Sequence, residues 1–452
     1  MSDEVLAASR QCLRECPGCG LFQAVPPLRP GMVAECLRCG EVLRRRRRDS
    51  LDVTLALNLS GLVLFGIAIA FPLFRMSLSG LHRDISMPVL PLRFEQQGLW
   101  QLGLVMLGTT LIAPVLRLAL TVGAILGLRL GWRADVLAAC VRWRVRLAPW
   151  AMTEVFLLGA FVAYTKLTSI AIVHVGTGVY ALGALMLLTV MSDAWLDEQA
   201  LWEAIGRRRG LPDQVRRAGA TRIGCDACGA VSRQVEGSRC PRCSAVLYHR
   251  KTDSLARTWA LLAAAVLCYL PANLYPVMTV IQLGRGHPST ILGGVQELME
   301  SRMWPLALLV FVASVLVPLL KLAGLSYMLI TTQRGSQVRL VDRARLYRLV
   351  EIIGRWSMID VFMVSILVAL VHMGVLAQVT PGFGGVFFAA VVILTMSASF
   401  SFDPRLMWDA AGVSGFGAAG VDDEAVASSR QAPGTEAVAM QPGQPVLPVK
   451  AR

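Results

Sequence analysis

Four Cys-x-x-Cys pairs, grouped into two sets, limit the folds that this chain can adopt. Each such turn presents two thiolates from one tight loop, and two turns complete the tetrahedron of four sulfurs that zinc prefers. Sixteen residues separate the pairs of the first set and eleven separate those of the second, so each gap has room for a β-hairpin. We therefore predict two structural zinc sites, each in a small zinc ribbon. The predicted ligands are Cys16, Cys19, Cys36, Cys39, Cys225, Cys228, Cys240 and Cys243.

Disulfides and a redox-active Cys-x-x-Cys are the alternative interpretations of these pairs. Zinc is favoured because the flanking sequence is basic and is expected to face the reducing cytosol, as argued below. Gly20, Gly40 and Gly229 follow three of the pairs, where a positive φ angle would let backbone N–H groups point at sulfur. The other three cysteines are expected to be free thiols or packing residues: Cys12, Cys140 and Cys268.

Long apolar segments follow each set of cysteines. The hydrophobic fraction is 55% and the mean hydropathy is +0.57, which is too high for a soluble protein with so few charges. About twenty apolar residues span a bilayer, and no early apolar core precedes the first segment, so we expect no cleaved signal peptide. Eight segments qualify as membrane spans, at 53–74, 99–128, 150–166, 177–195, 256–278, 303–331, 356–376 and 383–401.

The distribution of the basic residues predicts the orientation of these spans. The two termini and the loops on their side of the spans carry 36 Lys and Arg residues, whereas the opposite loops carry 5. Loops rich in Lys and Arg stay in the cytoplasm. Both termini and both ribbons are therefore expected to be cytoplasmic in a multi-pass membrane protein. The net charge of +14 is then a topology signal rather than a nucleic-acid footprint.

The chain also repeats itself. Asp49-Ser50-Leu51 matches Asp253-Ser254-Leu255 at an offset of 204, and after a two-residue slip Glu154-Val155-Phe156 matches Asp360-Val361-Phe362. Each half begins in the cytoplasm and spans four times, so the repeats are parallel. We predict five regions: a first ribbon (10–48), a first four-helix bundle (49–203), a second ribbon (220–250), a second bundle (251–410) and a disordered tail (411–452).

The loops between the spans predict further elements. Residues 169–175 and 277–283 are rich in β-branched residues and are expected to form short periplasmic strands. In each half, the strand after the first helix is expected to pair with a hairpin between the third and fourth helices. The basic, amphipathic segments 133–147 and 338–354 are expected to be helices lying at the cytoplasmic interface.

Two basic residues inside the predicted spans are candidate functional groups. Arg117 and Lys321 occupy equivalent positions in the two halves, and a basic side chain at the bilayer centre costs about 2.5–3.5 kcal/mol. Their expected counter-charges are Glu154 and Asp360. Two interpretations stay open: the basic groups reach the lipid headgroups, or they form a polar floor or proton relay in a substrate cavity.

Other polar residues extend the candidate site. Lys166 and His372 are at equivalent outer helix ends, where they either anchor the protein at the interface or contact a headgroup or transfer a proton. Small hydroxyl residues make the second half the more polar one, although helix packing also favours them. We therefore prefer the second bundle for a substrate cavity. These hydroxyl residues include Ser314, Ser357, Ser365, Thr395, Ser397 and Ser399.

The chain contains no G-x-x-x-x-G-K-[ST] phosphate loop and no H-E-x-x-H, and four-cysteine metal sites leave no open position for a catalytic water. We expect a protein that is not an enzyme; if it moves a substrate uphill, the energy must come from an ion gradient or from a partner.

Tandem Cys-x-x-Cys knuckles that each lead into four spans resemble the paraquat-inducible protein A family. The closing run from Phe402 to Asp409 resembles that family's closing motif, whereas the first half lacks its Pro-Arg. The likeness covers residues 12–410. It implies a claudin-like four-helix fold with a small extracellular sheet. It also implies an inner-membrane protein that exchanges lipids with a periplasmic MCE-domain tunnel protein.

Three functional hypotheses follow. In the first, the protein is a lipid-transport component in which each half buries its ribbon against its own bundle. Its second bundle opens a cavity to the periplasm, and Lys321 and Asp360 hold a phospholipid headgroup or shuttle protons there. In the second, it is a membrane-anchored zinc or redox sensor. In the third, it is a scaffold that only seats the tunnel protein.

Overall fold

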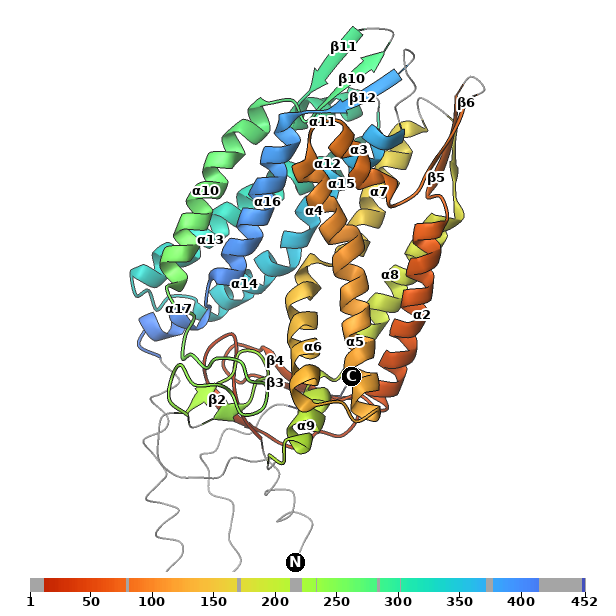
Figure 1. The fold of residues 1–452 in the computed structure, drawn as a ribbon. Coiled ribbons are helices and arrows are strands. Elements are labelled where there is room, and N and C mark those ends of the chain that lie inside the picture. The colour runs from red at the N-terminus through yellow and green to blue at the C-terminus, as the bar shows by residue number, and fades with distance from the viewer. Residues whose placement is uncertain are drawn as a thin grey trace, which may run out of the picture.

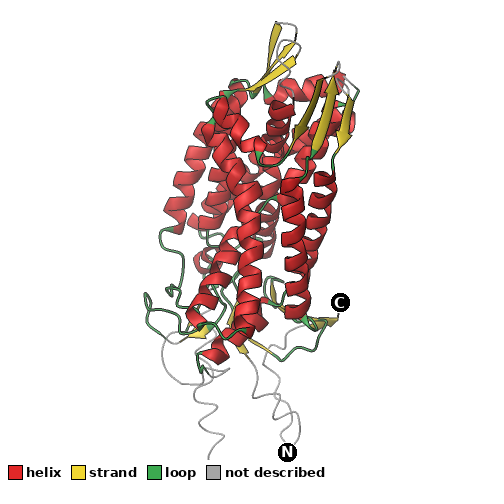
Figure 2. Cartoon of the chain, turned by 45° about the vertical axis from the view of Figure 1, so that its right-hand side comes forward, coloured by secondary structure: helices red, strands yellow, loops and turns green. Residues whose placement is uncertain are grey.

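The computed structural model describes residues 12–78, 81–168, 172–211, 222–232, 234–282, 285–300, 302–370, 377–413 and 449–451. Within them, eight helices are long and apolar enough to cross a membrane, as predicted, and the chain is a multi-pass membrane protein. They run side by side, with strands gathered at one end of the molecule and the cysteine ribbons at the other (Figures 1 and 2). We call these the sheet end and the ribbon end.

The first half places its helices in a fixed order. A long helix leads to a loop with a short helix, a second long helix, a third span made of two helices joined by a short 3₁₀ turn, a fourth long helix and a short closing helix. The elements are α2 (Ser50–Ala70), α3 (Val89–Gln96), α4 (Trp100–Met106), η1 (Leu107–Ile112), α5 (Ala113–Arg129), α6 (Ala134–Leu147), η2 (Ala148–Trp150), α7 (Thr153–Leu167), α8 (Thr177–Trp195) and α9 (Glu198–Arg208).

The second half repeats this order element by element, which agrees with the internal repeat in the sequence. Its elements are α10 (Ser254–Leu274), α11 (Ile291–Glu300), α12 (Trp304–Phe311), η3 (Val312–Leu316), α13 (Val317–Gln333), α14 (Leu340–Ile353), η4 (Gly354–Met358), α15 (Ile359–Leu370), α16 (Phe383–Ser401) and α17 (Arg405–Ala410).

Local sequence explains two features that the halves share. The chain enters α2 and α10 through Asp49 (φ 48°) and Asp253 (φ 51°), which are in the left-handed conformation that Asp tolerates better than most residues. The second long helix of each half contains a π-helical turn, η1 or η3, directly before the segment that begins with Pro114 or Pro318 at its second position. A proline lacks the N–H of a regular helix, and π turns are frequent at functional sites.

Each half also carries a three-stranded antiparallel sheet at the sheet end. The predicted strands exist over 172–175 and 278–282, and each pairs with a strand from the other loop of its own half. The hairpin lies in the first loop, not between the third and fourth helices. Two residues of the sequence, Ser79 and Gly80, separate these strands in the first half, and a two-residue stretch that contains glycine favours a hairpin. The orders are β6-β5-β7 and β11-β10-β12, with β5 (Phe74–Leu78), β6 (Leu81–Ile85), β7 (Ile172–Val175), β10 (Met278–Gln282), β11 (Arg285–Ser289) and β12 (Ala377–Pro381).

The predicted amphipathic segments are helical, as α6 and α14. α6 packs along α5 and continues through η2 into α7, so it stands beside the bundle instead of lying across its end (Figure 1). The halves meet through their third helices, α7 and α15. Gly159 makes this approach possible, because a Cβ there would lie 2.9 Å from the Cβ of Phe362.

Each ribbon is built from short antiparallel strands. The first contains two hairpins, and the last described residues of the chain, β13, add a strand beside β3. The strands are β1 (Cys12–Glu15), β2 (Phe22–Val25), β3 (Met32–Glu35), β4 (Val42–Arg45), β8 (Ile223–Gly224), β9 (Val231–Ser232) and β13 (Val449–Ala451). The tail predicted to be disordered otherwise lies outside the described residues from 414 to 448 and at 452.

The ribbons are crossed. The first ribbon shares a buried cluster with α10, α13, α14 and α17 of the second half, including Trp408. The second ribbon shares one with α2, α5, α6 and α9 of the first half, including Trp202. The expectation that each half buries its own ribbon is therefore wrong. The physical reason is that each ribbon covers the apolar face of a closing helix, α9 or α17, and the second ribbon follows α9 directly in the chain.

Candidate functional sites

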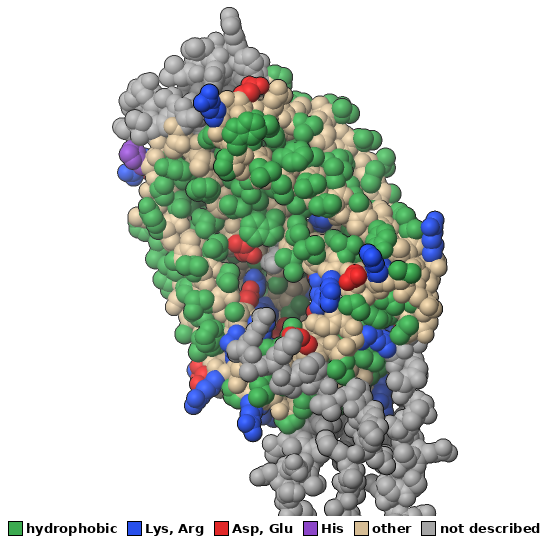
Figure 3. Space-filling model, turned by 180° about the vertical axis from the view of Figure 1, so that it is seen from behind, with side chains coloured by type: hydrophobic (Ala, Val, Ile, Leu, Met, Phe, Trp, Pro, Cys, Tyr) green, Lys and Arg blue, Asp and Glu red, His purple; other side chains and the backbone are tan. Residues whose placement is uncertain are grey.

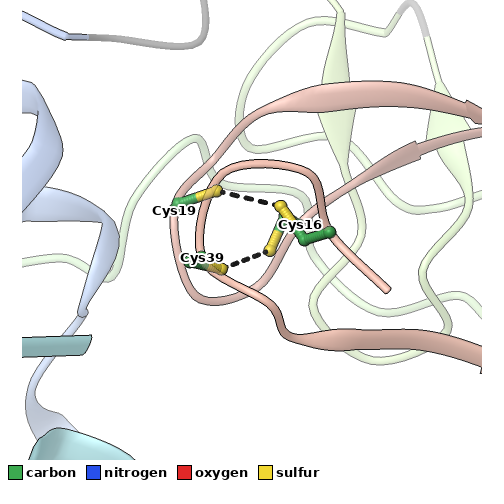
Figure 4. A group of neighbouring side chains, drawn as sticks. Cys16, Cys19 and Cys39 are labelled. Atoms are coloured by element: carbon green, nitrogen blue, oxygen red, sulfur yellow. Dashed lines mark hydrogen bonds between the residues drawn. The ribbon is translucent and has the colours of Figure 1, made fainter. Parts of the chain in front are cut away.

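The four cysteines of the first ribbon converge on one point. Cys16 lies 3.5 Å from Cys39 and Cys19 lies 3.5 Å from Cys36, sulfur to sulfur (Figure 4). These distances are too long for the ~2.05 Å bond of a disulfide. They match the separation of about 3.8 Å that ~2.3 Å zinc–sulfur bonds impose in a tetrahedron. The side-chain amide of Gln23 also donates a hydrogen bond to the Cys36 sulfur at 2.8 Å, and the sequence had not suggested this contact.

The second ribbon has the same geometry. Its sulfur pairs are Cys225–Cys243 at 3.5 Å and Cys228–Cys240 at 3.8 Å. In each set all four sulfurs lie within 4.8 Å of one another and all four residues are buried, so each set could hold a metal ion. A buried, four-ligand arrangement is typical of a closed structural site. Gly20, Gly40 and Gly229 have φ angles of 71°, 70° and 67°, as predicted.

Equivalent arginines hold each ribbon against the opposite bundle. Arg348 of α14 donates to the backbone carbonyl of Cys39 at 2.9 Å. Arg142 of α6, its counterpart in the first half, donates to the carbonyl of Cys243. Part of the basic charge on the predicted interfacial helices is thus used to bind the ribbons.

A buried charge network joins the two ribbons to the closing motif. The Arg405 guanidinium lies 3.0 Å from Asp403, 3.2 Å from Glu15 and 3.1 Å from Asp226, nitrogen to oxygen. Glu15 also accepts the backbone N–H of Gly224 in the second ribbon at 3.0 Å. One arginine therefore ties together the first ribbon, the second ribbon and the end of the second bundle.

Burial and pairing shift the pKa values of these carboxyl groups in opposite directions. Burial raises the pKa of Glu15, although Arg405 and Arg250 act to lower it. Burial also acts to raise the pKa of Asp403, but hydrogen bonds from Arg405 and the backbone N–H of Lys251, with the Arg405 charge, lower it overall. Asp403 is therefore the carboxylate that the network stabilises in its ionised form.

The second bundle contains a buried polar site around Lys321. This side chain is 2% exposed, and its ammonium donates to the Thr395 hydroxyl at 2.9 Å. The Ser314 and Ser357 hydroxyls are buried without a hydrogen-bond partner among the described residues. Ser365 is also buried, and donates to the carbonyl of Phe362. Ser314 in η3 and Ser357 in η4 belong to elements that pack against α13, which carries Lys321. Burying polar groups without hydrogen-bond partners is costly, and ionisable residues within membrane spans are often functional.

Apolar cavities lie toward the sheet end of the same bundle. Two neighbouring ones share Val277, Ile291 and Val364 in their walls. Their lining is almost entirely apolar, so the second bundle combines a polar base with apolar walls.

The equivalent position in the first bundle is polar and open. Arg117 pairs with Asp193, and Arg144 approaches the same carboxylate at 3.4 Å. Sequence reasoning had expected Glu154 as the counter-charge and had missed Asp193, because its position at the far end of α8 gives no local signal. Glu154 lines the same cavity. Three predicted groups are not described: the side chains of Lys166 and Asp360, and the whole of His372.

Comparisons with known proteins agree with this architecture. The family model described as "Paraquat-inducible protein A" matches residues 51–206 and 255–412. Intermembrane transport protein PqiA of Escherichia coli K12 is 34% identical over 400 residues, 87% of this chain and 95% of that protein. Lipophilic envelope-spanning tunnel protein A of the same organism is 31% identical over 405 residues, 88% and 91% of the two chains. A probable intermembrane transport protein of Haemophilus influenzae is 27% identical over 412 residues, 87% and 95%. No solved structure matches.

Proposed function

The chain belongs to the paraquat-inducible protein A family, and from this premise we propose that it is the inner-membrane component of a lipid transport system. It exchanges phospholipid between the inner membrane and a periplasmic MCE-domain tunnel protein, and so maintains the outer membrane. The names of its relatives, an intermembrane transport protein and an envelope-spanning tunnel protein, support a role in transport and not in catalysis.

The buried Lys321 site carries this proposal. The Lys321 ammonium, which is 2% exposed, can bind a phosphate oxygen or pass a proton. The Ser314 and Ser357 hydroxyls, which have no hydrogen-bond partner among the described residues, belong to η3 and η4, which pack against α13. Asp360, on the neighbouring α15, is its proposed partner. The apolar cavities toward the sheet end offer walls for acyl chains.

In this proposal the ribbon end is cytoplasmic and the sheet end is periplasmic. The uneven distribution of Lys and Arg supports this orientation. Each bundle with its sheet is then a claudin-like unit, and the units are 49–203 and 251–410. The ribbons, 10–48 and 220–250, each hold one zinc ion.

The zinc is proposed to be structural. All eight cysteines are buried, and the crossed packing makes each ribbon a brace between the halves. A sensor would need exchangeable zinc or reactive thiols, and these closed sites favour neither.

Site-specific photocrosslinking in cells labelled with radioactive phosphate tests the proposal. A photoreactive residue at Ser357 or Val364 samples the polar site and the apolar cavity, whereas Leu308 and Leu320, 63% and 57% exposed, are controls on the outer surface. Labelled adducts at the cavity positions well above the controls are expected. Equal labelling at all four positions would refute a cavity for lipid and favour the scaffold or sensor.

A further inference from the structure

The first bundle contains a second polar cavity at the place that corresponds to the Lys321 site. Arg117 is the counterpart of Lys321, and Thr189 is the counterpart of Thr395. The cavity differs in character, because it is open to the surroundings and lined by both basic and acidic groups. Its walls include Arg117, Glu154, Thr189 and Asp193.

Two guanidinium groups share one carboxylate at this cavity. Both Arg117 and Arg144 donate to Asp193, each through one terminal nitrogen. Their side chains are 15% and 10% exposed, whereas the Asp193 side chain is 45% exposed, which places the carboxylate at the mouth. A guanidinium carries five N–H donors in a planar fork, so each can hold Asp193 by one edge and a second anion by another.

The position of Asp193 places the mouth of the cavity near headgroup depth, because Asp193 is two residues from the end of α8. Arg144 and Glu154 lie on either side of η2, the joint at which α6 continues into α7 within one span. Figure 3 shows a hollow in the lower part of one face, with basic and acidic side chains around it and mainly hydrophobic side chains above.

We propose that this cavity binds the headgroup of a zwitterionic phospholipid from the membrane leaflet at the ribbon end. Arg117 and Arg144 hold the phosphodiester, and Asp193, at the mouth, accepts the ammonium group. This binding step extends the proposed function and rests on it for the direction in which the lipid then moves.

The charges at the cavity favour the binding of zwitterionic phospholipid headgroups. Two guanidinium groups and two carboxylates sum to zero, so a headgroup that carries one charge of each sign finds a partner for both. An anionic headgroup without an amine is repelled by the Asp193 carboxylate. An isolated cation is repelled by the Arg117 and Arg144 guanidinium groups. Charge-assisted hydrogen bonds in a partly desolvated site are strong enough to discriminate between these cases.

A photoreactive residue at Thr189, which lines the cavity, tests the proposal in the full-length protein. The protein is placed in nanodiscs with equal amounts of phosphatidylethanolamine and phosphatidylglycerol of identical chains, and adducts are identified by mass spectrometry. Phosphatidylethanolamine adducts are expected in about tenfold excess. At Leu187, 59% exposed on the same helix, adducts should follow the bulk ratio, and the same bulk ratio at Thr189 would overturn the proposal.

Substitutions test which side chain binds the phosphate of the headgroup and which binds its ammonium group. Arg144→Gln should reduce the phosphatidylethanolamine adduct about tenfold, and Asp193→Asn should shift the preference toward phosphatidylglycerol. The Arg129–Asp52 pair, exposed on the same bundle, supplies the controls Arg129→Gln and Asp52→Asn, which should change neither. If Asp193→Asn leaves the preference unaltered, or if the control variants lose the adduct equally, the assignment is wrong. Metal content and thermal unfolding confirm that each variant is folded.

Two further experiments are informative. One distinguishes a lipid headgroup from a soluble phosphate as the ligand, and the other distinguishes failure of this inference from failure of the proposed function. Loss of the adduct when millimolar inorganic phosphate or phosphoethanolamine is added would show recognition of a soluble phosphate and overturn the lipid assignment. Labelling near Lys321 without selective labelling at Thr189 would remove only this inference. Failure at both places would remove the proposed function as well.

Discussion

Phe156 and Phe362, which are 206 residues apart and occupy equivalent positions in the two halves, pack edge to face with their ring centroids 5.7 Å apart and their planes at 80°. Both side chains are fully buried. A residue that contacts its own counterpart lies on the axis that relates the halves. The two bundles therefore meet about this aromatic pair, between α7 and α15.

Phe156→Ala should destabilise the protein by about 3–5 kcal/mol, because it leaves a cavity where the halves meet and removes the aromatic contact. Thermal unfolding in detergent, followed by tryptophan fluorescence, measures this. Phe161→Ala is the matched control, since Phe161 lies one and a half turns further along α7 and is 58% exposed. Equal losses in both variants would mean that the pair does not stabilise the junction.

Loss of one metal site should loosen the opposite bundle. Cys36→Ser should lower the zinc content from two ions to one per chain, because a structural site needs all four thiolates. Hydrogen exchange should then rise in α17 and α13, which pack on the first ribbon. Cys240→Ser should instead affect α9 and α6, and Cys140→Ser should affect neither site. Faster exchange in α9 alone after Cys36→Ser would contradict the crossed arrangement.

Lys321→Met should abolish function without loss of stability. Methionine has a similar volume and removes the cost of a buried ammonium, so the free energy of unfolding should be unchanged or about 1–2 kcal/mol higher. Complementation of a deletion strain should fail at normal protein level. Thr395→Val removes the hydroxyl that accepts the hydrogen bond from Lys321, and it should also reduce complementation. Thr331→Val on α13 is the control and should complement normally. Full complementation by Lys321→Met would exclude the ammonium from transport.

Arg405→Gln should cost about 3–5 kcal/mol, because it leaves the buried carboxylates of Asp403 and Glu15 without their counter-charge. The loss is measured by chemical unfolding at neutral pH. Arg345→Gln, at an exposed pair with Asp342, should change stability by less than about 0.5 kcal/mol. A small loss at Arg405 would show that the network is not needed to join the ribbons.

The lowered pKa of Asp403 predicts an acid-sensitive junction. A carboxyl group with a depressed pKa stabilises the folded state above its unfolded pKa of about 3.9, and this contribution is lost as the pH falls through the lower folded value. Asp403→Asn should therefore be less stable than the wild type at pH 7, with the two converging below about pH 4. Unfolding temperatures between pH 3 and pH 7 measure this, and parallel curves would contradict it.

Sequence reasoning alone identified the two sets of four cysteines that could hold a metal ion, the eight spans, the internal repeat and strands at the sheet end. These features depend on short spacings or on local runs, such as Cys16-x-x-Cys19 or the twenty apolar residues of α2, and local physics is sufficient to specify them. Equivalent residues such as Arg117 and Lys321 could be matched for the same reason.

Which surfaces meet was established by the folded arrangement of the chain. The first ribbon lies on Trp408 instead of on the bundle that follows it, Arg117 pairs with Asp193 instead of with the predicted carboxylate, and Arg405 joins Glu15 across 390 residues. Burial of apolar area is non-directional, so sequence order does not say which closing helix a ribbon covers. Charged groups then pair with whatever partner that packing brings within reach, and this selection needs the folded chain.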